Sequence, residues 1–172
     1  PEPLAAEENS QQFSAAGEKK YHLAILDLGL RPELITALTG RGCDLTVFTV
    51  PLAAQVLGDI RPDALVLSGG SEQAAMQMDA PILNLVRDYC SRLPVLAVDA
   101  GYLLLARSYG LQPRKMKLGH SGANYPVQDM QDCRTRMTLQ HHSYVIDREQ
   151  VANRNGCIIT HQNINDGTVE GI

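Results

Sequence analysis

The chain has 172 residues, of which 44% are hydrophobic and 20% charged, a composition typical of a folded globular domain that excludes wholesale disorder. Its formal net charge of -4 excludes the basic electrostatic footprint expected of a nucleic-acid-binding protein. No apolar run approaches the roughly 20 residues that a membrane-spanning helix needs. We therefore expect a chain that neither binds nucleic acid nor inserts into a membrane.

The four cysteines and five histidines show no metal-ligand spacing. The cysteines contain no C-x-x-C pair, and their low density suits a reducing compartment such as the cytoplasm or an organelle matrix. Among the histidines, only His141 and His142 are close in sequence, and adjacent residues of a strand point to opposite faces. The sequence therefore predicts no metal site and no cofactor.

The first twenty residues, Pro1–Lys20, are rich in Glu, Gln, Ser and Ala and have no periodic apolar face. Such a segment cannot bury enough apolar surface to fold alone. We expect a flexible, solvated tail or linker that becomes ordered on a partner, followed by one folded domain over residues 21–172.

From residue 21 to residue 109, short apolar runs alternate with segments that have a helical apolar face. Strands are expected at Tyr21–Leu28, Asp44–Val50, Asp63–Ser68 and Pro94–Val98, and helices at Pro32–Thr39, Leu52–Leu57, Ala80–Ser91 and Gly101–Tyr109. This alternation predicts an α/β fold in which a central, mostly parallel sheet carries helices on both faces.

After Leu111 the pattern changes to short strand-like pieces separated by turns rich in Gly, Asp and Asn. These pieces are Lys115–Leu118, Asn124–Val127, Arg136–Leu139, Ser143–Ile146, Cys157–Thr160 and Thr168–Ile172. We expect them to form short antiparallel additions to the fold.

Two strand ends are candidates for function, because ligands of open α/β sheets bind at the carboxyl ends of the strands. One is the segment 68–71 (SGGS), whose glycines allow close backbone approach and can direct N–H groups at an oxyanion. An ordinary turn between strand and helix explains the same residues. The other is the segment 97–101 (AVDAG), which has the pattern of a nucleophile elbow around Asp99. Asp99 is also a suitable N-cap residue for the next helix, so this segment alone does not distinguish a nucleophile elbow from an ordinary helix start.

Several longer motifs run through the chain. They are RGCDLTV at 41–47, LSGG at 67–70, PVL at 94–96, LLLA at 103–106, KMKLGHSGANYPV at 115–127 and DGTVEGI at 166–172. From about Tyr21 to Ile172, the chain resembles a class I glutamine amidotransferase, the glutaminase domain of the small subunit of carbamoyl-phosphate synthetase. The resemblance implies the flavodoxin-like α/β fold of that family.

The resemblance implies a Cys-His-Glu triad with the cysteine on an elbow that reads G-x-C-x-G-x-Q. Aligned to this motif, the nucleophile position holds Asp99, the next residue of the pocket is Ala100, and the second glycine is Gly101. The glutamine that helps to hold the substrate is replaced by Leu103. The catalytic His and Glu, H-P-E in the family, would lie beyond Ile172, so we expect the domain to lack its C-terminal segment.

The rest of the implied substrate pocket is also degenerate. The family's oxyanion loop, S-N-G-P-G-D-P, reads S-G-G-S-E-Q-A here, so that Gly70 is kept and Glu72 replaces the second glycine. The family's substrate strand, Q-N-H-G-F, reads Q-H-H-S-Y, with His141, Ser143 and Tyr144 in place of Asn, Gly and Phe.

Amide hydrolysis in this family needs a strong nucleophile activated by a nearby base. A carboxylate at Asp99 is a far weaker nucleophile, and its charge opposes an oxyanion that forms beside it. Loss of the nucleophile alone costs on the order of 10⁶ in rate. Leu103 removes a polar partner of the substrate, and Glu72 adds bulk and a like charge. We expect a glutaminase-dead pseudoenzyme with no functional catalytic residue.

Such a domain suits a structural or regulatory component of a larger complex, with a larger protein partner such as a synthetase-like subunit or another multi-subunit assembly. Two enzymatic alternatives remain. One is the small subunit of a carbamoyl-phosphate synthetase that uses free ammonia. The other is a hydrolase of esters or alkyl halides with Asp99 as nucleophile and His141 or His142 as base.

Overall fold

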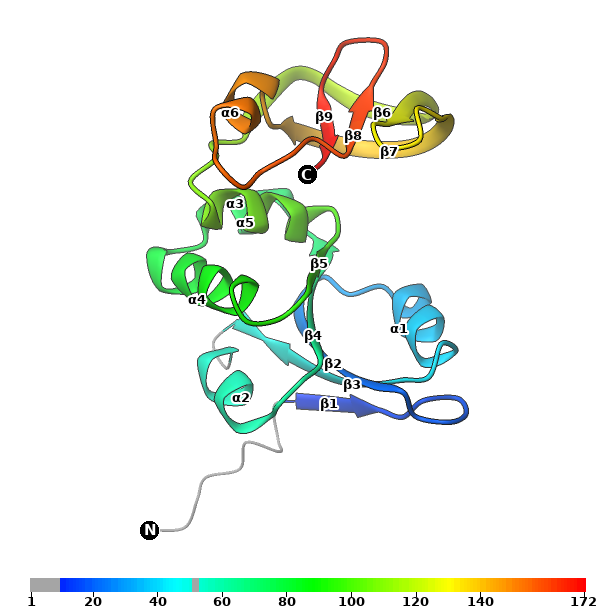
Figure 1. Cartoon of the computed structure of the whole chain (residues 1–172), viewed down its shortest axis with the longest axis vertical. Helices are drawn as coiled ribbons and strands as arrows, with labels where there is room; N and C mark the ends of the chain where they lie inside the picture. Colours follow the sequence, from blue (N-terminus) through cyan, green and yellow to red (C-terminus); the bar gives the residue numbers. More distant parts are fainter. Residues whose placement is uncertain (1–9, 51–52) are drawn as a thin grey trace. The chain divides into compact units, whose positions relative to one another are not determined.

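The computed structural model describes residues 10–50 and 53–172 (Figure 1). The chain divides into two compact units, of which the first ends at Leu105 and the second spans residues 106–172. Among the helices of these described residues, none is long and apolar enough to cross a membrane.

The first unit is an α/β unit built around one sheet. Its strands are β1 (Ser10–Phe13), β2 (Tyr21–Leu28), β3 (Cys43–Thr49), β4 (Ala64–Gly70) and β5 (Val95–Ala97). Its helices are α1 (Pro32–Thr39), α2 (Ala53–Asp59), α3 (Glu72–Gln77), α4 (Ala80–Cys90) and the start of α5 (Ala100–Ser108). The sheet order is β1-β3-β2-β4-β5, and all neighbours except β1 and β3 run parallel. The predicted parallel sheet is confirmed.

Helices pack on both faces of this sheet, as the strand–helix alternation predicts. Leu23 and Ile25 of β2 lie in a core cluster that packs against α1. Ala24 and Leu26 point to the opposite face, into a cluster that includes residues of α2, α4 and α5. Because successive strand side chains alternate between faces, an almost continuous apolar run is needed to supply both cores. Burying each such Leu or Ile side chain stabilises the fold by about 1.5–3 kcal/mol.

Strand β1 lies within the segment for which the sequence predicts a tail. Its four residues pair antiparallel with β3, and Phe13, opposite Leu45, packs against the core cluster beside α1. Asp44 of β3 anchors the segment that follows β1. Its carboxylate accepts the Ala15 N–H at 2.9 Å and forms an ion pair with the Lys19 ammonium at 2.9 Å. Residues 10–13 are therefore part of the sheet, and residues 1–9 lie outside the described part of the chain.

Two helix starts of the first unit follow from capping residues in the sequence. Helix α4 begins after Asp79, whose carboxylate accepts the Ile82 N–H at 3.4 Å, and Pro81 occupies its first turn. Helix α3, which the periodicity does not predict, begins after Ser71, whose hydroxyl accepts the Ala74 N–H at 3.3 Å. A helix this short, with one good cap, leaves no periodic signal.

The second unit is dominated by an antiparallel sheet of order β7-β6-β8-β9. Its elements are β6 (Arg114–Asp129), β7 (Thr135–Val145), α6 (Arg148–Ala152), β8 (His161–Asn163) and β9 (Val169–Gly171). The expected antiparallel additions are present, but the first four pieces form two long strands. Gly119 and Gly122 lie at shifts of the β6–β7 register and do not end β6. The strand expected at Cys157–Thr160 is instead β8, which begins just after that segment.

Candidate functional site

The turn between β5 and α5 is strained at Asp99. This residue has a φ of +54°, in the left-handed region that few residues other than glycine adopt. The turn is fixed on either side by backbone hydrogen bonds, from Val98 N–H to the Leu67 carbonyl at 3.1 Å and from Gly101 N–H to the Val98 carbonyl at 2.9 Å. Strand and helix therefore meet at a sharp corner that leaves the Asp99 side chain exposed.

The glycine of this corner is required by its close approach to β4. A Cβ at Gly101 would lie 2.3 Å from the Leu67 carbonyl oxygen, far inside van der Waals contact. The corner thus has the small neighbour that an elbow requires.

Asp99 contacts the second strand end that the sequence singles out. Gly70, the last residue of β4, donates its N–H to Asp99 Oδ2 at 3.1 Å. Gly70 has a φ of +154°, and a Cβ there would lie 1.6 Å from the Leu28 carbonyl oxygen, so that no other residue fits without a backbone shift. The N–H that the resemblance assigns to an oxyanion hole is therefore donated to the protein's own carboxylate.

The other expected pocket residues of the first unit lie on the two helices that follow these strand ends. Glu72 is the first residue of α3 and is half-buried. Ala100 and Leu103 belong to the first turn of α5 and are buried, at 0% and 2% exposure. At position 103, where the resemblance implies a glutamine, the side chain is thus apolar and buried.

The pocket residues expected in the second unit all lie on β7. His141 is exposed, and its Nδ1 lies 3.2 Å from the Ser121 hydroxyl of β6. Ser143 and Tyr144 are half-buried. His142 points to the other face of the strand, where it joins a cluster that the spacing of histidines in the sequence does not reveal.

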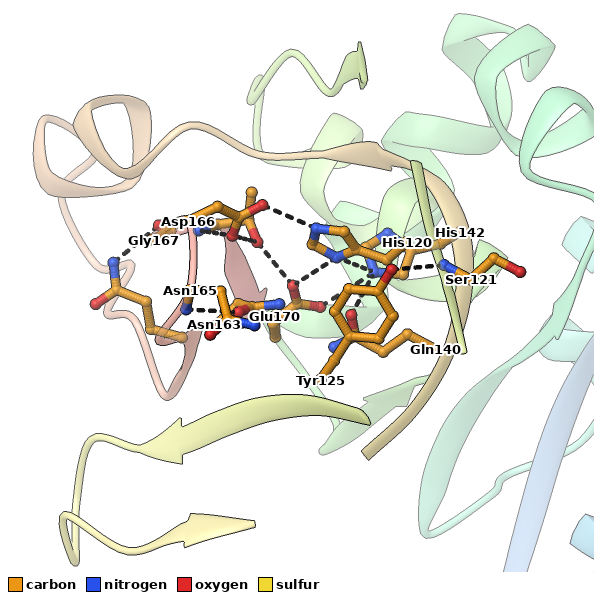
Figure 2. A network of polar contacts seen from close by, with 12 residues as sticks. His120, Ser121, Tyr125, Gln140, His142, Asn163, Asn165, Asp166, Gly167 and Glu170 are labelled. Carbon is orange, nitrogen blue, oxygen red and sulfur yellow. Dashed lines mark hydrogen bonds and ion pairs between the residues drawn. The ribbon is translucent and has the colours of Figure 1, made fainter. Parts of the chain in front are cut away.

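That cluster joins three strands of the second unit (Figure 2). His120 of β6 and His142 of β7 are direct cross-strand partners, and the Nδ1 atom of His120 lies 3.2 Å from the Nε2 atom of His142. Glu170 of β9 completes it, with one carboxylate oxygen 3.6 Å from His120 Nδ1 and the other 3.4 Å from His142 Nε2. The three side chains are largely buried, with exposures of 8%, 18% and 12% respectively.

The outer ring nitrogens of both histidines, which point away from the cluster, also have partners. His120 Nε2 lies 2.8 Å from a carboxylate oxygen of Asp166, and His142 Nδ1 lies 3.1 Å from the Tyr144 carbonyl oxygen. Burial raises the pKa of Asp166, but hydrogen bonds from Thr168 and His120 outweigh it, and the net effect lowers the pKa of this carboxyl below its ordinary value. Asp166 is therefore ionised near neutral pH, and its carboxylate accepts a hydrogen bond from the Nε2–H group of His120.

The local backbone of β6 directs His120 inward. The ring of His120 stacks on Tyr125, with centroids 4.5 Å apart, and the Tyr125 hydroxyl accepts the Ser121 N–H at 3.0 Å. Gly119 precedes His120 with a φ of +69°, and a Cβ there would lie 2.8 Å from the His142 carbonyl oxygen. Register shifts of this kind re-aim side chains at the inner face of a sheet. The motif residues around His120 and Glu170 are visible in the sequence, but their meeting in space is not.

The model of the family described as glutamine amidotransferase class-I matches residues 24–172. The chain belongs to this family. Among other members of this glutamine amidotransferase family, the arginine-specific carbamoyl phosphate synthase small chain of Bacillus subtilis (strain 168) is 37% identical over 174 aligned residues, which cover 100% of this chain and 48% of that one. The carbamoyl phosphate synthase small chain of Clostridium acetobutylicum is 34% identical over 150 residues, or 87% of this chain and 42% of that one.

Solved structures agree on the fold. A glutamine amidotransferase from Thermotoga maritima superposes with a TM-score of 0.59 at 17% identity, over 86% of this chain and 68% of that one. A Thermoplasma acidophilum protein described as part of a GMP synthase gives a TM-score of 0.65 at 18% identity, over 83% and 73% of the two chains. The class I glutamine amidotransferase fold expected from the sequence is confirmed. The chain spans about half the length of the carbamoyl phosphate synthase small chains that it matches.

Proposed function

We propose that this glutamine amidotransferase domain does not hydrolyse glutamine and serves as a structural or regulatory component of a larger complex. The observation that carries the proposal is the 3.1 Å hydrogen bond from Gly70 N–H to Asp99 Oδ2. A carboxylate stands at the elbow position where the family motif has its nucleophile, and it already accepts an N–H that an oxyanion would need.

Electrostatics makes this arrangement unfavourable for amide hydrolysis. The tetrahedral intermediate of acyl transfer carries a developing negative charge that must be stabilised by preorganised donors. Two like unit charges about 4 Å apart repel each other by about 4 kcal/mol near a protein surface. The Asp99 carboxylate therefore opposes the charge that Gly70 N–H would otherwise stabilise. Together with the missing thiolate, this supports a rate loss on the order of 10⁶ or more.

The first test is the release of ammonia from glutamine. We expect the wild-type chain to stay at the level of a buffer blank, and the Asp99→Cys variant to stay there too, because a thiol alone does not restore the polar side chain missing at Leu103. Asp79→Cys, which also places a new thiol at an exposed helix start, is the matched control. Ammonia released by the wild-type chain clearly above the blank contradicts the proposal.

A second measurement examines the pocket around the introduced thiol. A glutamine-mimicking electrophile is added to both cysteine variants in a background where the exposed Cys133 is replaced by serine. We expect Asp99→Cys to be labelled no faster than Asp79→Cys. Selective labelling at position 99 would show that the substrate pocket is more intact than we propose.

The proposed role requires a partner. The relatives with 34–37% identity are named as small chains of a synthase, which supports a place for this chain in a multi-subunit assembly. We expect a stable hetero-complex that buries about 800 Å² or more on each partner. Gel filtration of native extract, followed with an antibody to this chain, checks this expectation. Elution as a free monomer contradicts the assembly role.

The identity to carbamoyl phosphate synthase small chains over the whole chain also favours a second candidate, a small subunit of a synthetase that uses free ammonia. Co-purification of a large subunit that forms carbamoyl phosphate from ammonia, but not from glutamine, would support it. The third candidate, an Asp99-dependent hydrolase, is less favoured. The Gly70 N–H bound to its carboxylate lowers the nucleophilicity of Asp99, and both ring nitrogens of His142 already have partners.

A further inference from the structure

Three potential ligand atoms converge in the second unit, and the proposed function uses none of them. They are His120 Nδ1, His142 Nε2 and a carboxylate oxygen of Glu170, which all lie within 4.8 Å of one another (Figure 2). We propose that these three side chains bind one divalent transition-metal ion, with zinc as the best match to two imidazoles and a carboxylate.

The spacing of the three atoms fits a tetrahedral ion. With metal–ligand bonds of about 2.0–2.1 Å, neighbouring ligands of tetrahedral zinc lie about 3.3 Å apart. The nitrogens of His120 and His142 are 3.2 Å apart, and the carboxylate oxygens of Glu170 lie 3.6 and 3.4 Å from them. Because these distances involve two different oxygens of Glu170, a small rotation of its carboxylate is needed to bring one oxygen close to both nitrogens. Gln140 Oε1, 3.3 Å from His142 Nε2, offers a fourth ligand.

The hydrogen bonds on the outer side indicate which ring nitrogens carry a proton. The Tyr144 carbonyl oxygen can only accept, so His142 Nδ1 carries a proton, and the carboxylate oxygen of Asp166, 2.8 Å away, is an acceptor for a proton on His120 Nε2. If both rings are neutral, the inner nitrogens, His120 Nδ1 and His142 Nε2, each carry a lone pair. These two lone pairs face each other beside the carboxylate of Glu170. Lone pairs at this distance repel one another unless a cation lies between them.

The surroundings complete the pattern of a metal site. Metal-bound histidines commonly donate their outer N–H to a carboxylate or a backbone carbonyl, which are the partners of His120 and His142 here. The charges also balance, since Glu170 and Asp166 together offset a divalent ion. Burial of the three ligands and the stacking of Tyr125 on His120 keep competing water away.

The competing occupant is a single proton shared by the two imidazoles, and metal titration separates it from an ion. Chelator-treated chain is titrated with Zn²⁺ in a calorimeter and with Co²⁺ in a spectrophotometer. We expect one ion per chain and the intense visible absorption of four-coordinate Co²⁺. Glu170→Gln, which keeps the shape of the side chain, should weaken Zn²⁺ binding more than about 100-fold, and Asp166→Asn about 10- to 100-fold.

The matched control is His161→Gln, which removes a half-exposed histidine of the same sheet that is not part of the cluster and should leave the affinity unchanged. Far-ultraviolet circular dichroism checks that each variant folds. For a readout independent of variants, ¹⁵N chemical shifts of the histidine rings in the wild-type chain should move at His120 and His142 when Zn²⁺ is added.

The proposal is overturned if the folded wild-type chain binds no stoichiometric Zn²⁺ or Co²⁺ at micromolar concentration. Equal affinity of wild type and Glu170→Gln, or ring nitrogens that respond to acid but not to Zn²⁺, overturns it as well.

Discussion

Replacing Gly101 with alanine tests whether the elbow still governs the stability of the fold. The new Cβ would lie 2.3 Å from the oxygen and 2.7 Å from the carbon of the Leu67 carbonyl, whereas ordinary van der Waals contact begins at 3.4 Å. Since both atoms belong to the backbone of a buried strand, no side-chain rotation relieves the clash. Helix α5 must instead move away from β4 by about 1 Å, which strains a close-packed core.

Overpacking in a core costs typically 1–3 kcal/mol, and a clash with backbone belongs at the upper end, about 3 kcal/mol. For a chain of this size each kcal/mol lowers the Tm by about 2–4 °C, so we expect Gly101→Ala to melt about 6–12 °C below wild type. Thermal unfolding followed by circular dichroism measures the shift. Gly58→Ala is the control, because a Cβ at this helical position meets nothing within 4 Å and should raise stability by about 0.5–1 kcal/mol. If the two variants melt within 1–2 °C of each other, about the resolution of such shifts, the packing argument is wrong.

Substitutions at two other positions have expected outcomes that follow from local geometry and charge. Asp99→Val places a β-branched residue at a φ of +54° and should cost about 1–3 kcal/mol in urea unfolding, whereas Asp99→Asn, which tolerates this conformation, should stay within about 0.5 kcal/mol of wild type. The Lys19 ammonium and the Ala15 N–H, both bound to Asp44, hold the pKa of this carboxyl below its ordinary value of about 3.9. Asp44 thus contributes stability that is complete above the ordinary pKa and is lost as the pH falls through the lowered one. Asp44→Asn should therefore be less stable than wild type at neutral pH and lose that difference in acid unfolding curves as the pH falls below the ordinary pKa of Asp and through the lowered one. A constant difference down to the lowest pH would refute the assignment.

Four strands of the parallel half could be predicted from the sequence because each is a short apolar run between turn residues, whereas the polar β1 could not. The sequence also singles out the strand ends that hold Gly70 and Asp99, but only the structure shows their contact, 29 positions apart. The antiparallel half gave a weaker signal. Glycine often ends a strand, but the glycines of β6 lie inside the strand at register shifts. Many side chains of β6 are also exposed on both faces of the sheet.

The cluster of His120, His142 and Glu170 shows what sequence reasoning lacked. Its members are separated by 22 and 28 residues, and each lies on a different strand. Only the strand register places His120 opposite His142, and that register depends on shifts at Gly119 and Gly122 that no local pattern specifies. Spacing rules for metal ligands search for neighbours along the chain, so they find His141 beside His142 and miss the pair that meets in space.

Strand β1 has a practical consequence for work with this chain. Were it absent, β3 would become the edge of the parallel sheet and would present the unpaired N–H and C=O groups of residues 45–48 to solvent. Free edges of this kind recruit strands from other molecules and lead to aggregation. A version of the chain trimmed to begin at Tyr21, where composition alone places the start of the folded domain, would lose both this cover and the Phe13 side chain, and we expect it to be more prone to aggregate. The four residues SQQF thus protect the edge of β3 although their composition resembles that of a tail.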